Sequence, residues 1–282
     1  MSLRVGLIPI EPRIVNAAYM QISAYHKRRG DTVDWWLPIE DRAFDDIYCS
    51  SLFTFTDKRD VPARAICGGT GYDVSSRLGL AYEACEYDYS IYPRCHASLV
   101  WFSRGCIRQC SFCCVWWKDG PIHPVTPKPL NPRGEVVWVM DDNFFACEAW
   151  PEAIERLVAW GQPVDFQNGI DVRLYRPEHA RALKRLRWAK RLRCAWDDPH
   201  VDLREDIRRL AADWPQHKLM CYVLIGYDST AAEDLWRVQE LAGMGIDPFV
   251  MPYHRNDPYE RRFARWVNHK AIFRSVAWED YR

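Results

Sequence analysis

The most informative stretch of this chain is Ser98-Leu-Val-Trp-Phe-Ser-Arg-Gly-Cys-Ile-Arg-Gln-Cys-Ser-Phe-Cys113. It begins with an apolar run and continues into a loop that carries Cys106, Cys110 and Cys113 in a C-x3-C-x2-C spacing. Three thiolates this close together can bind three irons of a cubane [4Fe–4S] cluster and leave the fourth iron open. An open metal position lets a substrate or cofactor bind directly. A strand that leads into such a ligand-bearing loop is what a barrel enzyme requires.

A zinc site and simple packing are the alternatives for these thiols. Zinc takes four ligands, usually as two separated pairs, and this sequence has neither a second C-x2-C pair nor an H-x3-H segment. Cys114 adjoins Cys113, but adjacent residues rarely both reach one metal in a compact loop. The remaining cysteines form no second ligand run, which argues against an auxiliary cluster of the usual motif type and leaves open one assembled from distant positions. These are Cys49, Cys67, Cys85, Cys95, Cys114, Cys147, Cys194 and Cys221.

The spacing, with Phe112 directly before the third cysteine, resembles the radical S-adenosylmethionine (SAM) enzymes, in a branch related to cobalamin-associated and methylthiotransferase-like members. The resemblance implies that Cys106, Cys110 and Cys113 hold a [4Fe–4S] cluster and that SAM chelates its open iron. It implies that SAM is cleaved reductively to a 5′-deoxyadenosyl radical, which abstracts hydrogen from an unidentified substrate. Such an enzyme is oxygen-sensitive and takes its electron from a one-electron reductant such as flavodoxin or ferredoxin.

Residues 96–255 are strongly periodic. Six apolar runs predict strands, and four amphipathic stretches predict helices between the later runs. Thr230 and Glu233 form a capping-box pattern at the start of the last of these helices. Six units are too few for a closed eight-unit barrel, and they match the partial (β/α)6 barrel of the radical SAM family. The predicted strands are Leu99–Phe102, Val136–Met140, Val164–Phe166, Leu192–Trp196, Met220–Ile225 and Pro248–Tyr253, and the predicted helices are Trp150–Trp160, Pro177–Lys190, Leu203–Trp214 and Thr230–Met244.

Residues 1–95 predict a small parallel, Rossmann-like α/β domain ahead of the barrel. The segment Gly68–Gly71 is able to cradle an anion, although such turns are common after parallel strands. The domain looks like a degenerate relative of a cobalamin domain, but it has no D-x-H-x-x-G segment. We therefore expect this domain to have a structural or substrate-capping role and to bind no cobalamin. The alternative is that it binds cobalamin without a histidine ligand to the cobalt. The predicted strands are Val5–Ile10, Thr32–Trp36, Asp46–Phe55 and Ala63–Cys67, and the predicted helix is Asn16–Arg29.

Polar side chains follow every predicted strand of the barrel, and in a parallel barrel the chemistry lies at these carboxyl ends. The resemblance assigns one group to SAM, with at least one of Asp141, Asp142 and Asn143 on its amino group. We expect a second group, further round the barrel, to orient the substrate. Each of these residues could instead be a turn or cap residue. The predicted SAM-binding residues are Phe112, Asp141, Asp142, Asn143, Gln167, Asn168, Asp171, Arg173 and Gly226, and the predicted substrate residues are Asp197, Tyr227, Tyr253 and His254.

Charge and composition set limits on the partners. The 38 basic and 38 acidic side chains balance, which gives no general argument for binding nucleic acid or membrane. No apolar run reaches the roughly eighteen residues of a membrane span, and the N-terminus lacks a signal-peptide pattern. The odd number of cysteines, 11, points to reduced thiols. We therefore expect a cytoplasmic protein with no membrane partner.

Two basic stretches keep a nucleic-acid interpretation open. The first spans residues 177–193, and the second is the C-terminal extension 256–282, which predicts one helix over Tyr259–Phe273. The substrate of the enzyme could accordingly be a nucleobase, nucleoside or nucleic acid stacked on tryptophans. A small molecule or a peptide fits the same residues. The remaining alternative is a non-catalytic, metal-containing module that binds nucleic acid.

Overall fold

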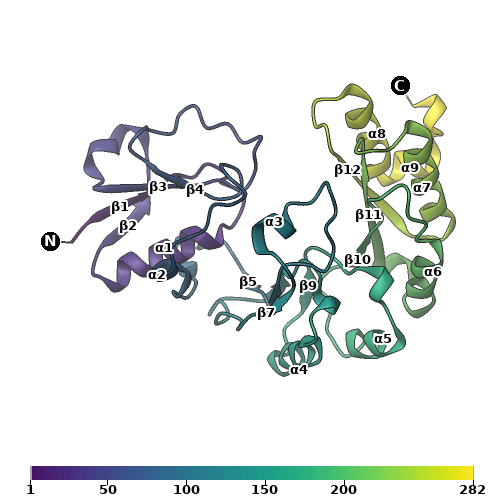
Figure 1. The fold of residues 1–282 in the computed structure, drawn as a ribbon, viewed down its shortest axis with the longest axis horizontal. Helices are drawn as coiled ribbons and strands as arrows, with labels where there is room; N and C mark the ends of the chain where they lie inside the picture. Colours follow the sequence, from purple (N-terminus) through teal and green to yellow (C-terminus); the bar gives the residue numbers. More distant parts are fainter. Residues whose placement is uncertain (1, 282) are drawn as a thin grey trace. The chain divides into compact units, whose positions relative to one another are not determined.

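The computed structural model describes residues 2–281, which form two compact units of α/β structure containing several parallel sheets (Figure 1). Within the described residues, the first unit comprises residues 2–100, 113–120 and 127–135, and the second comprises residues 101–112, 121–126 and 136–281. The chain between Trp101 and Val136 therefore contributes alternately to both units. A single cut in the sequence does not separate them.

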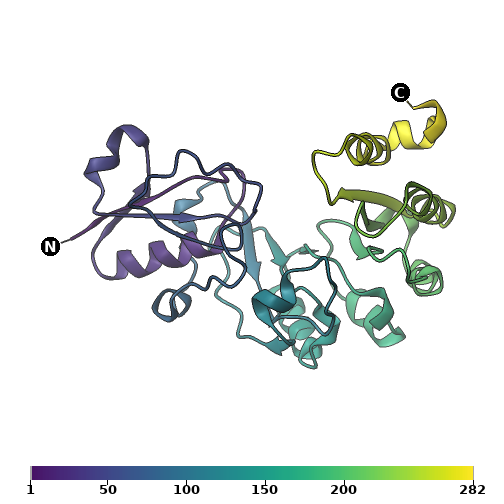
Figure 2. The same cartoon turned by 45° about the horizontal axis from the view of Figure 1, so that its top comes forward.

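A parallel four-stranded sheet in the order β2-β1-β3-β4 forms the centre of the first unit. Buried apolar side chains such as Val5 and Leu7 pack against α1, which is visible along the sheet in Figure 2. The Asn16 side chain caps α1 by accepting a hydrogen bond from the Ala18 amide at 3.0 Å. The elements are β1 (Arg4–Leu7), α1 (Ala17–Arg28), β2 (Thr32–Trp35), η1 (Pro38–Ala43), β3 (Asp46–Ser50), β4 (Ile66–Gly68), α2 (Leu80–Glu83), η2 (Tyr89–Ile91), β5 (Ala97–Val100) and α3 (Val115–Asp119).

Three predicted strands of this unit are shorter in the structure or shifted. The strand expected to reach Ile10 ends at Leu7, and the one expected to reach Phe55 ends at Ser50. The strand expected at Ala63–Cys67 is Ile66–Gly68. The apolar pattern continues beyond Ser50, but after Ser51 the amides of Leu52 and Phe53 donate to the Glu11 side chain instead of to a neighbouring strand.

Parallel strands also organise the second unit. β8 pairs with β9, and β10, β11 and β12 pair in that order. Two isolated parallel bridges, Val164↔Trp188 and Ile170↔Cys194, link the β9 and β10 regions. The elements are β6 (Ser103–Arg104), β7 (His123–Pro124), β8 (Val136–Val139), η3 (Phe144–Ala146), α4 (Trp150–Trp160), β9 (Val164–Phe166), η4 (Val172–Leu174), α5 (Pro177–Leu183), β10 (Leu192–Ala195), α6 (Arg204–Asp213), η5 (Gln216–Lys218), β11 (Leu219–Ile225), α7 (Ala231–Gly243), β12 (Asp247–Pro252), α8 (Pro258–Asn268), α9 (Lys270–Ser275) and η6 (Trp278–Asp280).

The two faces of strands β10–β12 differ in burial. Helices α7 and α8 pack on one face (Figure 1), where Cys194, Cys221, Val223 and Val250 are buried. Side chains at the alternate positions, which point to the opposite face, are half-buried or exposed: Arg193, Ala195, Met220, Tyr222, Leu224, Phe249 and Met251. This second face, which we call the open face, also carries polar groups toward the carboxyl ends of its strands.

Several helix predictions are confirmed and two are wrong. Helix α4 has the predicted bounds, and the Thr230–Glu233 capping box is present at α7. The helix expected over 177–190 ends at Leu183, because the chain then turns and the Arg187 carbonyl accepts a hydrogen bond from the Val164 amide at 2.7 Å. The single helix expected over 259–273 is instead α8 and α9, which meet at His269.

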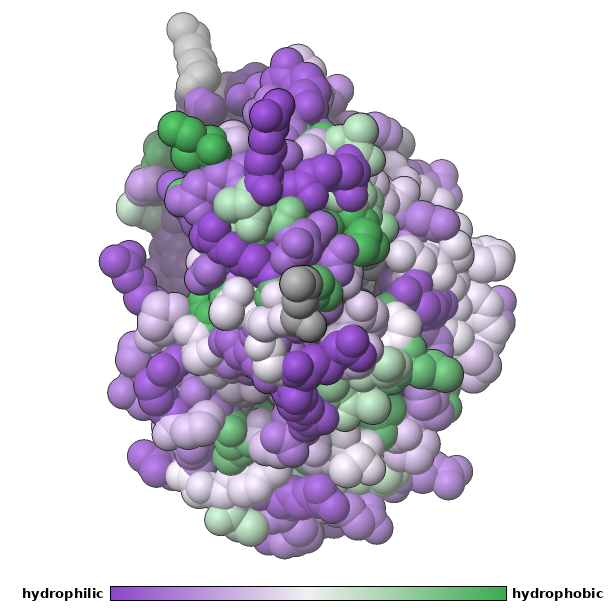
Figure 3. All heavy atoms as spheres, turned by 90° about the vertical axis from the view of Figure 1, so that its left-hand side faces the viewer, coloured by the Kyte–Doolittle hydropathy of each residue, from purple (hydrophilic) through white to green (hydrophobic). Residues whose placement is uncertain are grey.

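The surface of the first unit seen in Figure 3 is mainly hydrophilic, with scattered apolar side chains. Ile39 and Leu80 are the most exposed large apolar residues among those described, at 93% and 83% exposure. Isolated apolar residues of this kind are normal on protein surfaces. No helix within residues 2–281 is both long and apolar enough to cross a membrane.

Candidate functional site

The cysteine loop begins in the second unit, where the sulfur of Cys106 accepts two hydrogen bonds. They come from the Arg108 amide at 3.3 Å and from the Asn143 side-chain amide at 3.4 Å. Burial raises the pKa of the Cys110 thiol, and the nearby Arg173 guanidinium partly offsets that rise. Hydrogen bonds to sulfur and nearby cations both stabilise a thiolate. The hydrogen bonds to Cys106 therefore suit a thiolate ligand, whereas the pKa of Cys110 stays raised overall, which favours its protonated thiol.

Cys113 belongs to the segment 113–120 of the first unit. Its sulfur accepts a hydrogen bond from the Val115 amide at 3.5 Å, two residues further on, as Cys106 does from Arg108. Cys114 is exposed and directly precedes the short helix α3. Among residues 2–281 no three His, Cys, Asp or Glu side chains gather in a group arranged to hold a metal ion. The fit to a cluster thus rests on the donor chemistry of each thiol.

The three polar residues after β8 have different surroundings. Asp141 is buried and its carboxylate accepts hydrogen bonds from the Phe102 amide at 3.0 Å, the Ser103 amide at 2.6 Å and the Ser103 hydroxyl at 2.5 Å. Burial raises the pKa of Asp141, and these hydrogen bonds offset the rise in part. Asp142 accepts a hydrogen bond from Asn168 at 3.4 Å. Asp141 therefore holds the turn that leads into the cysteine loop.

Asn143 is the polar residue here with spare hydrogen-bonding capacity. The residue is 3% exposed, and its side-chain amide donates to the Cys106 sulfur. Its Oδ1 atom is buried and has no hydrogen-bond partner within the described part of the chain. A buried acceptor without a donor costs about 1–3 kcal/mol. Such an oxygen beside the cysteine loop is suited to receive an N–H from a ligand.

Two arginines converge on Asp171. Arg108, between the first two cysteines, donates through Nε to Asp171 at 3.0 Å, and Arg173 donates through Nε at 2.6 Å and Nη2 at 3.1 Å. Burial alone would raise the pKa of Asp171. The hydrogen bonds and charges of Arg173 and Arg108 together lower it by more, so the net shift is downward. Arg108 thereby ties the cysteine loop to the segment after β9. Its role escapes sequence analysis because its partner lies 63 positions away.

Gln167 and Asn168, also expected at the SAM site, bond to neighbouring groups of the sheet. Gln167 donates to Asp165 at 2.7 Å, and Asn168 donates to the Met140 carbonyl at 3.0 Å. Asp165 also pairs with Arg193 of β10. These contacts connect β8, β9 and β10 near their carboxyl ends.

Four aromatic rings join the cysteine loop to the ends of β11 and β12. The ring of Phe112 lies 5.5 Å from that of Tyr227, which lies 4.8 Å from that of Tyr253. The ring of Tyr253 lies 5.0 Å from that of His254. Four predicted site residues from three separate segments are thus brought together, and Tyr253 and His254 are exposed. An aromatic wall of this kind can stack a planar ligand.

A buried carboxylate fixes the orientation of His254. Glu260 of α8 is 3% exposed. Its carboxylate accepts one hydrogen bond from the His254 backbone amide at 2.8 Å and a second from the His254 ring atom Nδ1 at 2.9 Å. Gly226, with φ +78°, makes this possible, because a Cβ there would lie 2.0 Å from the Glu260 carboxylate. An Nδ1–H bond to a carboxylate leaves Nε2 available to accept a proton or a hydrogen bond. Sequence analysis missed Glu260, which reads as an ordinary acidic residue in the first turn of a helix.

Asp197 follows β10 on the same side of the strand as Arg193. Its Oδ1 atom accepts a hydrogen bond from the Leu224 amide at 3.0 Å. Burial raises the pKa of Asp197 to about 6, against the lowering effects of that hydrogen bond and of Arg237 and Arg173. A carboxyl group with a pKa in this range can exchange a proton near neutral pH. The structure thus gives Asp197 the electrostatics of an acid–base group.

The basic stretches are partly neutralised within the second unit. Four side chains of 177–193 form ion pairs, and Asp247 engages two cations of α9 as well as Arg191. Acidic side chains therefore pair with many of the basic side chains on these surfaces. The pairs are Lys184–Asp213, Arg185–Glu155, Arg191–Asp247, Arg193–Asp165, Lys270–Asp247 and Arg274–Asp247.

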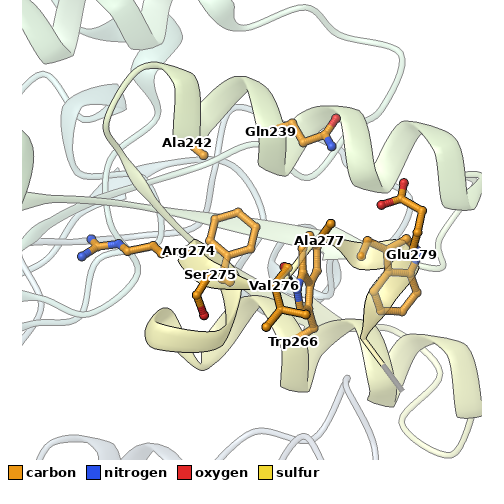
Figure 4. Close-up of a pocket in the computed structure, with 10 residues that line it drawn as sticks. Gln239, Ala242, Trp266, Arg274, Ser275, Val276, Ala277 and Glu279 are labelled. Atoms are coloured by element: carbon orange, nitrogen blue, oxygen red, sulfur yellow. Dashed lines mark hydrogen bonds between the residues drawn. The ribbon is translucent and has the colours of Figure 1, made fainter.

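A cavity of about 450 Å³ lies among α7, α8 and the C-terminal segment (Figure 4). The indole of Trp266 stands in its wall and donates to the Val276 carbonyl at 2.9 Å. None of the predicted site residues lines this cavity, so it is separate from the candidate site. Its lining residues are Gln239, Ala242, Trp266, Phe273, Arg274, Ser275, Val276, Ala277, Trp278 and Glu279.

Comparison with known proteins adds no family assignment. No family model matches this sequence, and no curated protein matches it.

Proposed function

We propose that this chain is a radical SAM enzyme with a partial (β/α)6 barrel that acts on a substrate yet to be identified. The observation that carries the proposal is the buried, unpartnered Oδ1 of Asn143, whose own amide donates to the first cysteine of a C-x3-C-x2-C loop. A ligand ammonium group beside a cluster bound at that loop would satisfy this oxygen. The parallel strands β8–β12, whose carboxyl ends carry the other polar groups, agree with such a barrel.

Under this proposal each group of residues has a separate task. Cys106, Cys110 and Cys113 would hold the [4Fe–4S] cluster, which when bound supplies the electron that cleaves the carbon–sulfur bond of SAM. Asn143 would accept from the SAM ammonium group. Arg173, which donates to Asp171 through Nε and Nη2, would pair through its Nη1 atom with the SAM carboxylate.

The aromatic wall and its neighbours would serve the nucleoside and the substrate. Phe112 and Tyr227 would flank the adenine, and Tyr253 would shield the reacting atoms from water. His254, held by Glu260, would present Nε2 to the substrate, and Asp197 would hold or release a proton. A nucleobase substrate stacked on these rings remains an alternative within the same chemistry.

The first test is chemical. After anaerobic reconstitution we expect about four irons and four sulfides per chain, and reduction with dithionite should yield 5′-deoxyadenosine and methionine from SAM. Alanine at Cys106, Cys110 or Cys113 should abolish iron binding, whereas the control Cys114→Ala should retain it. Full iron content in any of the first three variants, or no 5′-deoxyadenosine from a fully loaded sample, would contradict the proposal.

The second test concerns Asn143. Asn143→Ala should weaken SAM binding to the reconstituted protein about tenfold or more, since a hydrogen bond to a charged group contributes roughly 1.5–3 kcal/mol. Asn143→Asp keeps an acceptor oxygen and should retain most of the affinity. Equilibrium dialysis with labelled SAM measures both variants, and their iron content must match the wild type. Equal affinity of Asn143→Ala and wild type would refute this role.

A further inference from the structure

The side chain of Glu11 lies where an α/β domain usually binds its ligand. In the order β2-β1-β3-β4 the chain leaves β1 toward β2 on one side and returns to β3 on the other, so the topological switch point lies between β1 and β3. Ligands of open parallel sheets bind at the carboxyl ends of the strands at such a point. Glu11 stands in the loop after β1, and its carboxylate reaches the loop after β3.

Four residues of the loop after β3 surround this carboxylate with donors. Glu11 Oε1 accepts hydrogen bonds from the Ser51 hydroxyl at 3.0 Å, the Leu52 amide at 3.1 Å, the Phe53 amide at 3.2 Å and the Thr56 hydroxyl at 2.6 Å. Oε2 accepts a second bond from the Leu52 amide at 3.0 Å. Two successive backbone amides and two hydroxyls aimed at one oxygen are the donor set of an oxyanion site.

The donor loop is built from buried parts and not from chance surface contacts. Ser51 is 0% exposed, and its carbonyl accepts the Gly71 amide at 2.8 Å. A Cβ at Gly71 would lie 2.4 Å from the Ser51 hydroxyl oxygen, and one at Gly69 would lie 2.4 Å from the Ser51 carbonyl oxygen. The glycine-rich segment after β4 thus supports the donor loop from behind. Lys58 also donates to the Phe53 carbonyl of this loop, at 3.1 Å.

Glu11 and its hydrogen-bond donors come from different loops, because Glu11 follows β1 and the donors follow β3. Glu11 is half-buried, and although burial raises the pKa of its carboxyl, the hydrogen-bond donors of the loop after β3 lower that pKa by more. Its segment lies in neither helix nor strand. The carboxylate itself is held by the donors of the loop after β3, while the neighbouring Ile10 packs against the core of the first unit.

We propose that Ser51, Leu52, Phe53 and Thr56 form an oxyanion-binding site, that Glu11 is its resident occupant, and that a phosphate or carboxylate group of a small molecule takes its place when the loop after β1 moves out. This inference is independent of the proposed radical SAM chemistry. An intrachain carboxylate acts at a high effective concentration, so free anions should not displace it at millimolar levels.

The test removes the occupant and supplies an anion. Full-length Glu11→Ala is titrated with inorganic phosphate and, separately, with acetate at constant ionic strength, and its thermal unfolding temperature is followed. We expect a saturable rise with at least one anion and none for wild type or for Glu86→Ala, an exposed glutamate in the same unit. A response to phosphate alone identifies a phosphoryl ligand, and a response to acetate alone identifies a carboxylate.

Two further variants keep the test decisive. Thr56→Val in the Glu11→Ala background removes one donor and should weaken the anion response by about tenfold. Glu11→Gln, which fills the same volume without the charge, should show the same anion response more weakly and serves if Glu11→Ala does not fold. The proposal is overturned if neither Glu11 variant responds to either anion more than Glu86→Ala does.

Discussion

Asp141 and Asn143 stand two positions apart and have opposite hydrogen-bonding states. The Asp141 carboxylate is fully used by the backbone and hydroxyl of the turn at Phe102 and Ser103. Asn143 is equally buried, yet its Oδ1 has no partner in the described structure. Both side chains are acceptors for an ammonium group by chemistry alone. Only the spare acceptor can bind a ligand without first breaking the turn, because Asp141 would have to abandon three bonds.

Asp197 should make the stability of the second unit depend on pH. Its folded-state pKa is about 6, above the ordinary 3.8, because burial disfavours the charge. Between these values the folded state binds more protons, so stability falls as pH rises from 4 to 6, and the full cost remains above pH 6. We expect Asp197→Asn, whose Oδ1 can still accept from Leu224, to be more stable than wild type at pH 8 by at most about 3 kcal/mol.

Urea unfolding at pH 8 and pH 4.5 measures this effect. The advantage of Asp197→Asn should shrink toward zero at the lower pH, where the wild-type carboxyl is protonated in the folded state. Asp198→Asn, at the exposed neighbouring position, is the control. A constant difference between wild type and Asp197→Asn across this range would show that the carboxyl is not perturbed.

At the scale of elements, Asp247 fastens the amino end of β12 to two other segments. It pairs with Arg191, just before β10, and with Lys270 and Arg274 of α9. Burial raises the pKa of Asp247, but these three cations lower it much more. The carboxylate therefore stabilises the fold above the unfolded-state pKa near 4, and that contribution is lost as pH falls through the depressed folded value.

Asp247→Asn should lower the free energy of unfolding by about 1–3 kcal/mol at pH 7, since it removes charge-assisted hydrogen bonds. Urea denaturation monitored by tryptophan fluorescence gives the value. Glu148→Gln, an exposed site in the same unit, is the matched control and should change little. The gap between wild type and Asp247→Asn should begin to narrow below about pH 4 and keep shrinking as the pH falls toward the depressed folded-state value; a gap that does not narrow below pH 4 would count against the ion-pair explanation.

Across the whole molecule, the segment after the second cysteine is divided between the units. Helix α3 is fixed within the first unit, where Arg77 donates to the Trp117 carbonyl at 3.2 Å and Lys118 donates to the Ser76 carbonyl. A fragment of residues 96–282 lacks these partners. We expect trypsin to cleave after Lys118 faster in that fragment than in the full chain. Cleavage after Lys184, which pairs with Asp213 of the second unit, is the internal control, and equal rates at Lys118 would contradict the division.

Local sequence patterns predicted the elements whose stability is local. Helix α4 and the capping box of α7 have the expected positions, because amphipathic spacing and caps act within a few residues. The helix expected to reach Lys190 stops at Leu183 because pairing near β9 outweighs helical propensity. A similar competition explains the early end of β3, because the Leu52 and Phe53 amides bond to Glu11.

The α/β class, the cysteine spacing and the kinds of polar residue that follow the strands can all be predicted from the order of the amino acids. The tertiary structure alone decided which of them are available, because each hydrogen-bond partner comes from a distant segment. Glu260 became the partner of His254, Arg108 the partner of Asp171, and Glu11 the occupant of the loop after β3. The chemical type of a side chain is known from the sequence, whereas its hydrogen bonds and its pKa depend on neighbours that only folding brings close.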